Sequence, residues 1–430
     1  MSEVVAIALA GGQGVRARPM TLEAPGHMRS KAALCLAGRP VIEWQVATLQ
    51  DQGVEHFYVV ANGRENRYQI KDLLGYGDAL GVEVQYSRAR MDRHNTGSGE
   101  ATLSALEHWG LRGLALVFPT DSLFEFDLAE MVRAHRRSGA VVTIAAVELR
   151  PEGAAGKYGT MVADAAGWVR AFVEKPALEE IRATHPDRVP INAGLYLVDC
   201  ARLRRLARRP DLVALSRRQL DWGGDLLPWL VAGGYPVRLH PVSKIGDLGN
   251  VPDYLATLAD LLGGGYPQLL KRMEPPYAGN VWIHESSLLR RDPVSGMSLA
   301  AKLAGGVVTI GPNVQIGRDV EIGPGVVLRD TAIGDGVDLH QGCRLSRVAC
   351  LDGVVVGTDA VVSDTFLGLM ARVESSRNRP TVLDGCCALG HDVTVPAGTR
   401  LSGVTAYPGL TVPAGTRIPT GTVLTERMAS

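Results

Sequence analysis

Three glycines and an arginine near the start of the chain form a pattern that suits a polyphosphate ligand. Gly11, Gly12 and Gly14 lie close together, and Arg16 follows them. Glycine allows positive φ angles and lets a ligand approach the backbone closely, and successive amide N–H groups in such a turn form a concave anion site. Arg16 adds a fixed positive charge beside this site. The alternative interpretation is a tight surface turn followed by a solvated arginine.

Two common phosphate-binding loops do not match this stretch. A P-loop closes with Lys-Ser or Lys-Thr, and neither pair follows the glycines here. The dinucleotide-binding fingerprint needs a third glycine at a fixed spacing, and that glycine is missing. The glycine turn therefore indicates a different type of nucleotide site.

The elements that must position this turn are short apolar strands that alternate with helices. Residues 4–8 form an apolar run rich in β-branched side chains, which predicts a buried parallel strand directly before the glycines. Similar runs occur at 57–61, 114–118, 141–147 and 191–198, with helical segments between several of them. This alternation predicts an α/β fold with a doubly wound, mostly parallel sheet.

Candidate ligand-binding residues follow several of these expected strands. A second glycine turn contains Gly97 and Ser98 and leads into a helix, and Asp121 follows the run at 114–118. Ligands of doubly wound sheets bind beyond the carboxyl ends of the strands. We therefore expect both turns and Asp121 to meet at one edge of the sheet.

The last third of the chain shows a six-residue period. Aliphatic residues recur at Ile310, Ile316, Ile322 and Leu328 and, after a one-residue slip, at Ile333, Leu339, Leu345 and Leu351. This spacing is typical of hexapeptide repeats, whose stacked aliphatic side chains fill a left-handed parallel β-helix. A generic glycine-rich β region is the alternative. We expect an α/β domain at 1–262, a linker at 263–301 and a β-helix domain at 302–430.

Composition excludes several classes of partner. The 430 residues include 45 Lys+Arg and 45 Asp+Glu, so the formal charge is zero and neither nucleic acid nor an anionic membrane is indicated. The first apolar run is too short to span a bilayer, and no basic segment precedes it as in a signal peptide. Six cysteines lack the spacing of a metal site or disulfide framework. We expect a cytoplasmic protein.

The glycine turn also carries a family resemblance. Residues 9–21, LAGGQGVRARPMT, match the pattern L-A-G-G-x-G-x-R-x-x-P-x-T of the nucleoside-diphosphate-sugar (NDP-sugar) pyrophosphorylases. Later segments resemble the ADP-glucose pyrophosphorylase branch of that family: Ser30-Lys31-Ala-Ala, Thr120-Asp121, Glu174-Lys175-Pro176, Asp221-Trp-Gly-Gly-Asp225 and Gly246-Asp247-Leu-Gly249-Asn250. The resemblance implies an enzyme that transfers a nucleotidyl group from an NTP to a sugar 1-phosphate.

The resemblance also implies roles for charged residues. The second pKa of a phosphate monoester is about 6, so the attacking sugar phosphate needs no general base, and catalysis rests on positioning and charge neutralisation. Arg16 is assigned to the leaving phosphates and Lys31 to the α-phosphate. Asp121 and Asp247 are assigned to Mg²⁺, which prefers hard carboxylate oxygens. Either aspartate could instead cap a turn or helix, and Lys31 could be a surface lysine.

Further residues are assigned to the two substrates by the same resemblance. The nucleotide-binding residues are Leu9, Ala10, Gly11, Gly12, Gly14, Gly97 and Ser98. The sugar-phosphate-binding residues are Tyr158, Gly159, Glu174, Lys175, Asn192, Gly194 and Asp225. Asn192 and Asp225 could equally satisfy backbone groups, Tyr158 could belong to the core, and Lys175 could be solvated. His27 and His135 are interpreted as structural or solvent-facing.

The chain departs from the family pattern at several positions. Ala32, Thr120, Ile245 and Asn250 replace the usual proline, glycine, aromatic residue and threonine. These departures leave the reaction class intact but open the choice of substrate, so a sugar or a sugar-like cyclitol 1-phosphate is expected. No glutamine directly precedes Gly97, unlike in many UTP and dTTP enzymes of the fold, which favours a purine NTP.

Two other functions remain as alternatives. A catalytically silent subunit that binds NDP-sugar is disfavoured because Arg16, Lys31, Asp121 and Lys175 are all present. A bifunctional enzyme would transfer acyl groups on the β-helix with a histidine base, for which His340 and His391 are candidates. We favour a β-helix that assembles a homo-oligomer, a dimer or tetramer. Since all chemical motifs precede residue 262, we expect its removal to affect assembly before chemistry.

Overall fold

The computed structural model describes residues 4–24, 26–88, 96–292, 295–415 and 417–425. The chain forms two compact units: the first takes in residues 1–12 and 42–245, and the second residues 13–41 and 246–430. The second unit therefore includes the end of the glycine turn as well as the C-terminal repeats. The sequence boundary at residue 262 stays a prediction. None of the helices in the described ranges combines the length and apolar character needed to cross a bilayer.

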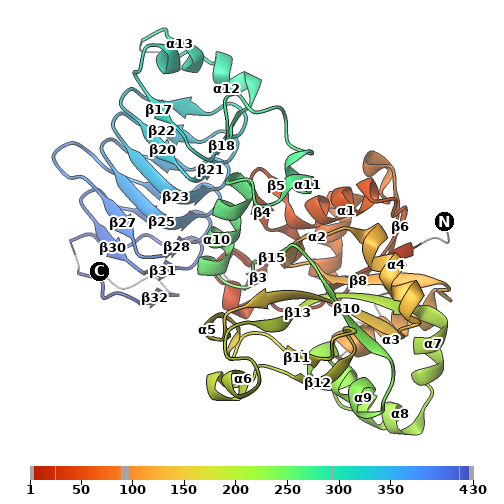
Figure 1. The fold of residues 1–430 in the computed structure, drawn as a ribbon. Coiled ribbons are helices and arrows are strands. Elements are labelled where there is room, and N and C mark those ends of the chain that lie inside the picture. The colour runs from red at the N-terminus through yellow and green to blue at the C-terminus, as the bar shows by residue number, and fades with distance from the viewer. Residues whose placement is uncertain (1–3, 25, 89–95, 293–294, 416, 426–430) are drawn as a thin grey trace. The chain divides into compact units, whose positions relative to one another are not determined.

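The first unit is built on a mixed β-sheet (Figure 1). Within the described residues it has nine strands, in the order β12-β11-β13-β8-β1-β6-β7, with β10 between β13 and β14. The strands are β1 (Val4–Ala10), β6 (His56–Ala61), β7 (Glu83–Tyr86), β8 (Leu114–Pro119), β10 (Val142–Leu149), β11 (Thr160–Ala163), β12 (Val169–Val173), β13 (Val189–Asp199) and β14 (Val237–Pro241). The predicted α/β class is confirmed.

The sheet is parallel where the glycine turn begins and mixed beyond it, where β14 runs parallel to β10 and the other pairs are antiparallel. β1 lies between β6 and β8, and β7 follows β6, all in parallel. β13 runs antiparallel to β8 and β10, and β11 pairs with β12 as an antiparallel hairpin. A parallel strand needs a long crossover, whereas a short turn suffices for an antiparallel hairpin. The short turn at residues 164–168 therefore explains why β11 and β12 depart from the parallel pattern.

Helices of the first unit bury apolar faces against the sheet. They are α1 (Val41–Asp51), α2 (Arg64–Leu74), α3 (Ser98–His108), α4 (Leu128–Ser138), α5 (Pro151–Ala154), α6 (Leu178–Thr184), α7 (Cys200–Leu206), α8 (Pro210–Ser216) and α9 (Leu227–Ala232). Leu103 and Leu106 of α3 lie in one core cluster with Val5 and Ile7 of β1. Burial of each such side chain contributes about 1.5–3 kcal/mol, so this packing fixes α3 beside the strand that carries the glycine turn.

Short elements complete the region around the glycine turn and the first sheet. They are β2 (Leu22–Ala24), β3 (His27–Met28), β4 (Cys35–Leu36), β5 (Arg39–Pro40), β9 (Ser122–Glu125) and the 3₁₀ turns Val15–Ala17, Lys31–Ala33 and Asp78–Leu80. β15 (Lys244–Asp247) then leads from the first unit into the second.

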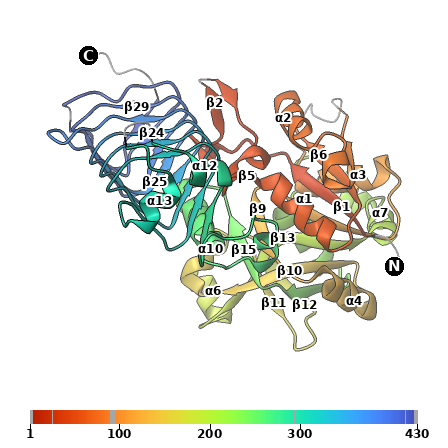
Figure 2. The same ribbon diagram turned by 90° about the horizontal axis from the view of Figure 1, so that it is seen from above.

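The second unit is dominated by stacked coils of parallel strands (Figure 2). One row contains β16 (Val281–Ile283), β18 (Val314–Ile316), β21 (Thr331–Ile333), β23 (Arg344–Cys350), β25 (Val361–Leu367), β28 (Cys387–Leu389), β31 (Thr405–Ala406) and β32 (Val423–Leu424). Joined to it are β17 (Thr309–Ile310), β20 (Val327–Arg329), β27 (Val382–Asp384) and β30 (Arg400–Ser402). A separate row contains β19 (Glu321–Ile322), β22 (Asp338–Leu339), β24 (Val355–Val356), β26 (Arg372–Val373) and β29 (Thr394–Val395). This architecture is consistent with a β-helix.

Ile310 pairs with Leu328, 18 residues further along the chain, whereas Ile316 and the rows that follow it as far as β25 pair at a distance of 17 residues. Ile316, Ile333, Cys350 and Leu367 occupy one row of paired positions. From Leu328 to Cys350, the six-residue spacing therefore shortens by one residue once in each coil. Cys350, and not the predicted Leu351, occupies the next position of the row, because a second slip follows Leu345.

One row of the stack is covered by α10 (Val251–Leu262), which belongs to the same unit. The ring of Tyr254 on α10 meets the ring of Phe366 edge-on, with centroids 5.6 Å apart. The hydroxyl of Tyr254 also donates to the carbonyl of Cys35 at 2.5 Å. One buried tyrosine thus joins α10, the repeats and the segment that follows the glycine turn.

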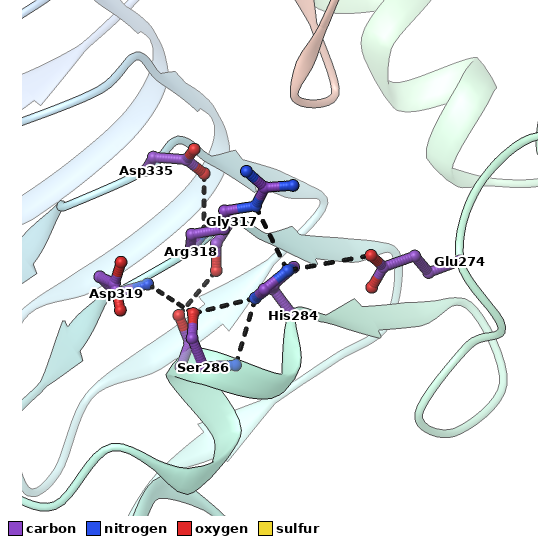
Figure 3. Close-up of polar contacts among 8 residues, drawn as sticks. Glu274, His284, Ser286, Gly317, Arg318, Asp319 and Asp335 are labelled. Carbon is purple, nitrogen blue, oxygen red and sulfur yellow. Dashed lines mark hydrogen bonds and ion pairs between the residues drawn. The ribbon is translucent and has the colours of Figure 1, made fainter.

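Short helices precede the first coil: α11 (Pro267–Leu270), α12 (Glu285–Leu289) and α13 (Leu299–Ala304). Figure 3 shows His284 at the start of α12, where its Nδ1 accepts from the backbone N–H of Ser286 at 3.2 Å. The Ser286 hydroxyl accepts from the backbone N–H of Asp319 at 3.0 Å. Capping groups of this kind satisfy backbone donors that a helix leaves unpaired. We interpret the cluster as a structural cap that attaches α12 to the first coil.

Candidate functional site

The glycines at the end of β1 leave open space above the backbone. A Cβ atom on Gly12 would meet nothing within 4 Å, and one on Gly11 would meet only the Cβ of Asn62, at 3.7 Å. The preceding residues are held in place, because the carbonyl of Leu9 accepts from the backbone N–H of Thr120 at 3.2 Å and that of Ala10 accepts from Asn62 at 3.2 Å. A fixed strand end with an open glycine backbone suits close approach by a ligand.

The loop with Asp121 is held by Gln45, a side chain that no sequence motif singles out. The Nε2 of Gln45, on α1, donates to the carbonyl of Pro119 at 2.8 Å and to that of Ser122 at 2.5 Å. Gln45 is buried, with 5% of its surface exposed. The amide therefore brackets Asp121 from both sides and fixes the direction of its backbone.

Several of the residues predicted to bind sugar phosphate come together in the first unit. The ammonium of Lys175 lies 3.8 Å from the Glu174 carboxylate. Lys175 has φ of 49°, a left-handed conformation that costs a residue with a Cβ about 1–2 kcal/mol. Burial raises the pKa of Glu174, and the charge of Lys175 opposes this shift. Such strain in a charged loop is typical of binding sites.

Asn192 forms hydrogen bonds within the protein, as expected if its side chain satisfies backbone groups. Its Oδ1 accepts from the backbone N–H of Gly194 at 2.9 Å, and its Nδ2 donates to the hydroxyl of Tyr196 at 2.9 Å. Its backbone N–H donates to the carbonyl of Gly159 at 2.8 Å. Asn192 thus joins β13 to the glycine beside Glu174, and a contact with sugar stays a prediction.

Asp225 is also engaged by the backbone. One of its carboxylate oxygens accepts from the N–H of Asp221 at 2.8 Å. Asp221 precedes the π-helical turn Trp222–Leu226 and Asp225 lies within it, and Trp222 of this turn stacks on Tyr196 with ring centroids 4.3 Å apart. Tyr158 is partly buried and packs against the small core cluster that contains Ile191.

Asp221 connects the sugar-side turn to the second glycine turn, a role missed at the sequence level. Its Oδ1 accepts from the backbone N–H of Ser98 at 3.0 Å and from its hydroxyl at 3.3 Å. The carbonyl of Leu220 accepts from the next two amides, those of Gly99 and Glu100, at 2.8 and 3.1 Å. The first amides of α3 are therefore satisfied by protein groups, and a nucleotide contact through Gly97 or Ser98 stays a prediction.

The second unit holds the other predicted charged residues. Gly14 has φ of 63°, and a Cβ there would lie 2.8 Å from the side chain of Thr21, so the turn requires glycine. Arg16 follows in the 3₁₀ turn Val15–Ala17. Asp247 accepts from the backbone N–H of Gly249 at 2.8 Å, and a Cβ on Gly249 would lie 3.8 Å from the guanidinium of Arg16. The side chains of Arg16 and Asp247 therefore both approach Gly249.

Lys31 lies at the start of the 3₁₀ turn Lys31–Ala33 in the same unit. Asp121 and Asp247 belong to different compact units. Among the described residues there is no group of three or more His, Cys, Asp or Glu side chains that could hold a metal ion. Mg²⁺ usually binds through one or two carboxylates plus substrate phosphates, so a single carboxylate, such as that of Asp121 or Asp247, suits a metal that binds together with a nucleotide.

The two histidines considered for acyl transfer, His340 and His391, both contact other groups of the protein. His391 is buried, and its Nδ1 accepts from the backbone N–H of Leu369 at 2.8 Å. His340 pairs with Asp338 at 3.0 Å and lines a cavity of about 390 Å³ beside α12 and α13. Lys302 and Asp292, which also line this cavity, form an ion pair at 2.5 Å. His135 is buried and contacts the Thr143 hydroxyl at 2.8 Å, whereas His27 is exposed.

Comparison with known proteins identifies the family. Residues 5–263 match the family model described as Nucleotidyl transferase, and residues 304–418 match the one described as GMPPB C-terminal domain. The chain belongs to the nucleotidyl transferase family. The first match includes both glycine turns and every predicted site residue.

Curated relatives of this nucleotidyl transferase extend over most of its length. A UTP–glucose-1-phosphate uridylyltransferase of Synechocystis sp. is 28% identical over 365 residues, which cover 79% of this chain and 85% of the relative. A mannose-1-phosphate guanylyltransferase of Mycobacterium tuberculosis is 29% identical over 349 residues, covering 80% and 84%. A glucose-1-phosphate adenylyltransferase of Alteromonas mediterranea is 23% identical, covering 82% and 85%. The predicted enzyme class, sugar-1-phosphate nucleotidyltransferase, is confirmed.

Proposed function

We propose that this enzyme condenses a purine NTP with a sugar 1-phosphate or a sugar-like cyclitol 1-phosphate, giving an NDP-sugar and pyrophosphate. The match of residues 5–263 to the nucleotidyl transferase family carries the proposal. The names of the three relatives specify uridylyl, guanylyl and adenylyl transfer to glucose or mannose 1-phosphate. The family therefore supports the reaction, while the preference for a purine rests on the missing glutamine before Gly97.

In the proposed mechanism, phosphate charge is neutralised by fixed groups. The open backbone at Gly11 and Gly12 receives the nucleotide, Arg16 holds the leaving phosphates and Lys31 the α-phosphate. Lys175 binds the phosphate of the sugar substrate, and Glu174 accepts hydrogen bonds from its hydroxyls. Attack on the α-phosphorus then needs alignment more than proton transfer.

Asp121 and Asp247 would hold Mg²⁺ in this proposal. Both provide hard carboxylate oxygens, and the Asp121 backbone is fixed by Gln45. When bound, Mg²⁺ neutralises negative charge on phosphate oxygens.

We also infer that the enzyme is a cytoplasmic homo-oligomer, a dimer or tetramer, assembled through a left-handed β-helix of hexapeptide repeats. The six cysteines, all within the described residues, form no disulfide bond, which fits a reducing compartment.

A substrate matrix tests the proposed function. ATP, GTP, UTP and CTP are each combined with glucose 1-phosphate, mannose 1-phosphate and an inositol 1-phosphate, with Mg²⁺, and pyrophosphate release is measured. We expect one pair with a purine NTP to exceed the others in kcat/KM by at least about tenfold, about 1.4 kcal/mol of discrimination. Preference for UTP or CTP would overturn the purine assignment, and no release from any pair would overturn the function.

A further inference from the structure

The Glu174 carboxylate lies in a slot between two glycine backbones. A Cβ on Gly223 would lie 2.4 Å from its Oε2 and 2.9 Å from its Cδ. A Cβ on Gly159 would lie 2.7 Å from the same oxygen and 2.5 Å from the Phe172 ring. Atoms do not pack at such distances without displacement. Any side chain at either glycine would therefore move the carboxylate.

Glycine is required at these two positions because a side chain would not fit, and not because the backbone has an unusual conformation. Neither Gly159 nor Gly223 is among the residues with positive φ, so alanine fits the backbone at both positions. Gly224 lies in the same π-helical turn as Gly223, and a Cβ there would meet only the Cβ of Asp221, at 3.9 Å. The two neighbouring glycines thus differ mainly in whether a methyl group would reach Glu174.

Local charges do not by themselves fix the carboxylate in this place. Lys175 attracts it from 3.8 Å, but the ammonium is on an exposed side chain, where such a pair contributes little. The negative charge of Asp221 opposes ionisation of Glu174. The close approach of the two glycine backbones therefore limits the space open to the Glu174 carboxylate on the protein side, while its side chain stays 34% exposed.

We propose that Gly159 and Gly223 are positioning residues that fix Glu174 for recognition of the sugar hydroxyls. This inference rests on the proposed function. A confined carboxylate accepts hydrogen bonds from only one arrangement of hydroxyls, so the slot contributes to discrimination between sugar 1-phosphates that differ at one carbon. A sugar whose hydroxyl lies out of reach of the carboxylate forgoes this hydrogen bond and binds more weakly.

Steady-state kinetics of Gly223→Ala and its matched control Gly224→Ala test the role. With the best NTP from the matrix, we expect Gly223→Ala to raise KM for the sugar 1-phosphate by about 10- to 100-fold. Its KM for the NTP stays within about twofold of wild type, and the preference between glucose 1-phosphate and mannose 1-phosphate shrinks. Gly224→Ala should behave as wild type. Equal kinetics for the two variants would overturn the inference.

A stability cycle tests the slot without relying on activity. Gly223→Ala should lower the melting temperature more than Gly224→Ala in the wild-type background. In a Glu174→Ala background the two substitutions should cost the same, because the clashing carboxylate is gone. A persistent difference in that background would refute the slot. If the substrate matrix shows no activity at all, the proposed function and the sugar role fail, while this cycle still decides whether Glu174 is confined.

Discussion

Asp121 is held in a direction set by one buried amide. Gln45 bonds the carbonyls on both sides of the loop, at Pro119 and Ser122. These bonds fix the backbone on both sides of Asp121, and a fixed backbone is the support that a preorganised charged group needs. The role of Asp121 as a Mg²⁺ ligand stays a prediction, which a substitution can test.

We expect Asp121→Asn to abolish turnover while the protein stays folded. The amide has the shape of the carboxylate but lacks the charge of a Mg²⁺ ligand, so the barrier should rise by several kcal/mol, about 10³-fold in kcat. Pyrophosphate release is measured over a range of Mg²⁺, with circular dichroism to verify folding. Asp72→Asn, at an exposed position on α2, is the control. Near-normal rates with metal still required would remove Asp121 from the metal site.

Lys175→Ala should raise KM for the sugar 1-phosphate by at least about tenfold and leave KM for the NTP nearly unchanged. Lys175 lies next to Glu174 on the sugar side of the first unit. Because φ of Lys175 is 49°, Lys175→Gly tests the charge without left-handed strain. Both variants should lose sugar affinity alike. A shift of the NTP constant instead would place Lys175 on the other substrate.

At the scale of elements, sequence patterns predicted positions along each strand but not contacts between distant ones. The apolar run before Gly11 and Gly12 was enough to place the glycine turn at a strand end. Gln45 and Asp221 could not be found in the same way, because they act on partners 77 and 123 residues away. No periodicity or short motif records such a hydrogen bond. Only the folded sheet brings these segments together.

The repeats of the second unit also show that short-range spacing does not predict long-range pairing. The six-residue period predicted the aliphatic rows through Leu345, but it placed Leu351 where the structure has Cys350. A small buried thiol is compatible with the core row, so hydrophobic spacing alone did not mark the second slip. Pairing between coils, which fixes the register, is a long-range property.

Two buried histidines make stability depend on pH. Burial lowers the pKa of both His135 and His391 to about 4, below the value near 6.5 of an unfolded histidine. Between these values the unfolded chain binds more protons than the folded one. Stability is therefore fully present above about pH 6.5 and falls towards pH 4, by at most about 3 kcal/mol for each histidine.

We expect the melting temperature to fall between pH 7 and pH 5 and this fall to be smaller in His391→Asn. Asparagine retains an acceptor for the backbone N–H of Leu369 but does not titrate. His108→Asn, at an exposed position on α3, should keep the full pH dependence. Thermal unfolding by circular dichroism measures all three proteins. Identical pH profiles would show that His391 is not the titrating group.

At the scale of the whole molecule, the predicted site residues do not all belong to one compact unit, although their motifs all lie in the first part of the chain. Every predicted chemical motif precedes residue 262, yet Arg16, Lys31 and Asp247 belong to the same unit as the stacked coils. Tyr254 contributes to this grouping, since it contacts both Phe366 in the coils and Cys35 in the segment after the glycine turn. Loss of the coils would remove the surface on which α10 packs.

Removal of residues 302–430 should therefore abolish nucleotidyl transfer together with assembly, contrary to the expectation from motif order. The deletion exposes the apolar face of α10 and removes Phe366, and truncation of one buried phenylalanine alone costs about 3–5 kcal/mol. Light scattering gives the molar mass, and single-turnover pyrophosphate release gives the chemistry. Full-length Phe366→Ala should weaken transfer but keep the oligomer, and Phe366→Leu should do so less. A truncated protein that keeps wild-type transfer would show that the coils do not support the charged residues, and one that keeps its molar mass would refute assembly through the β-helix.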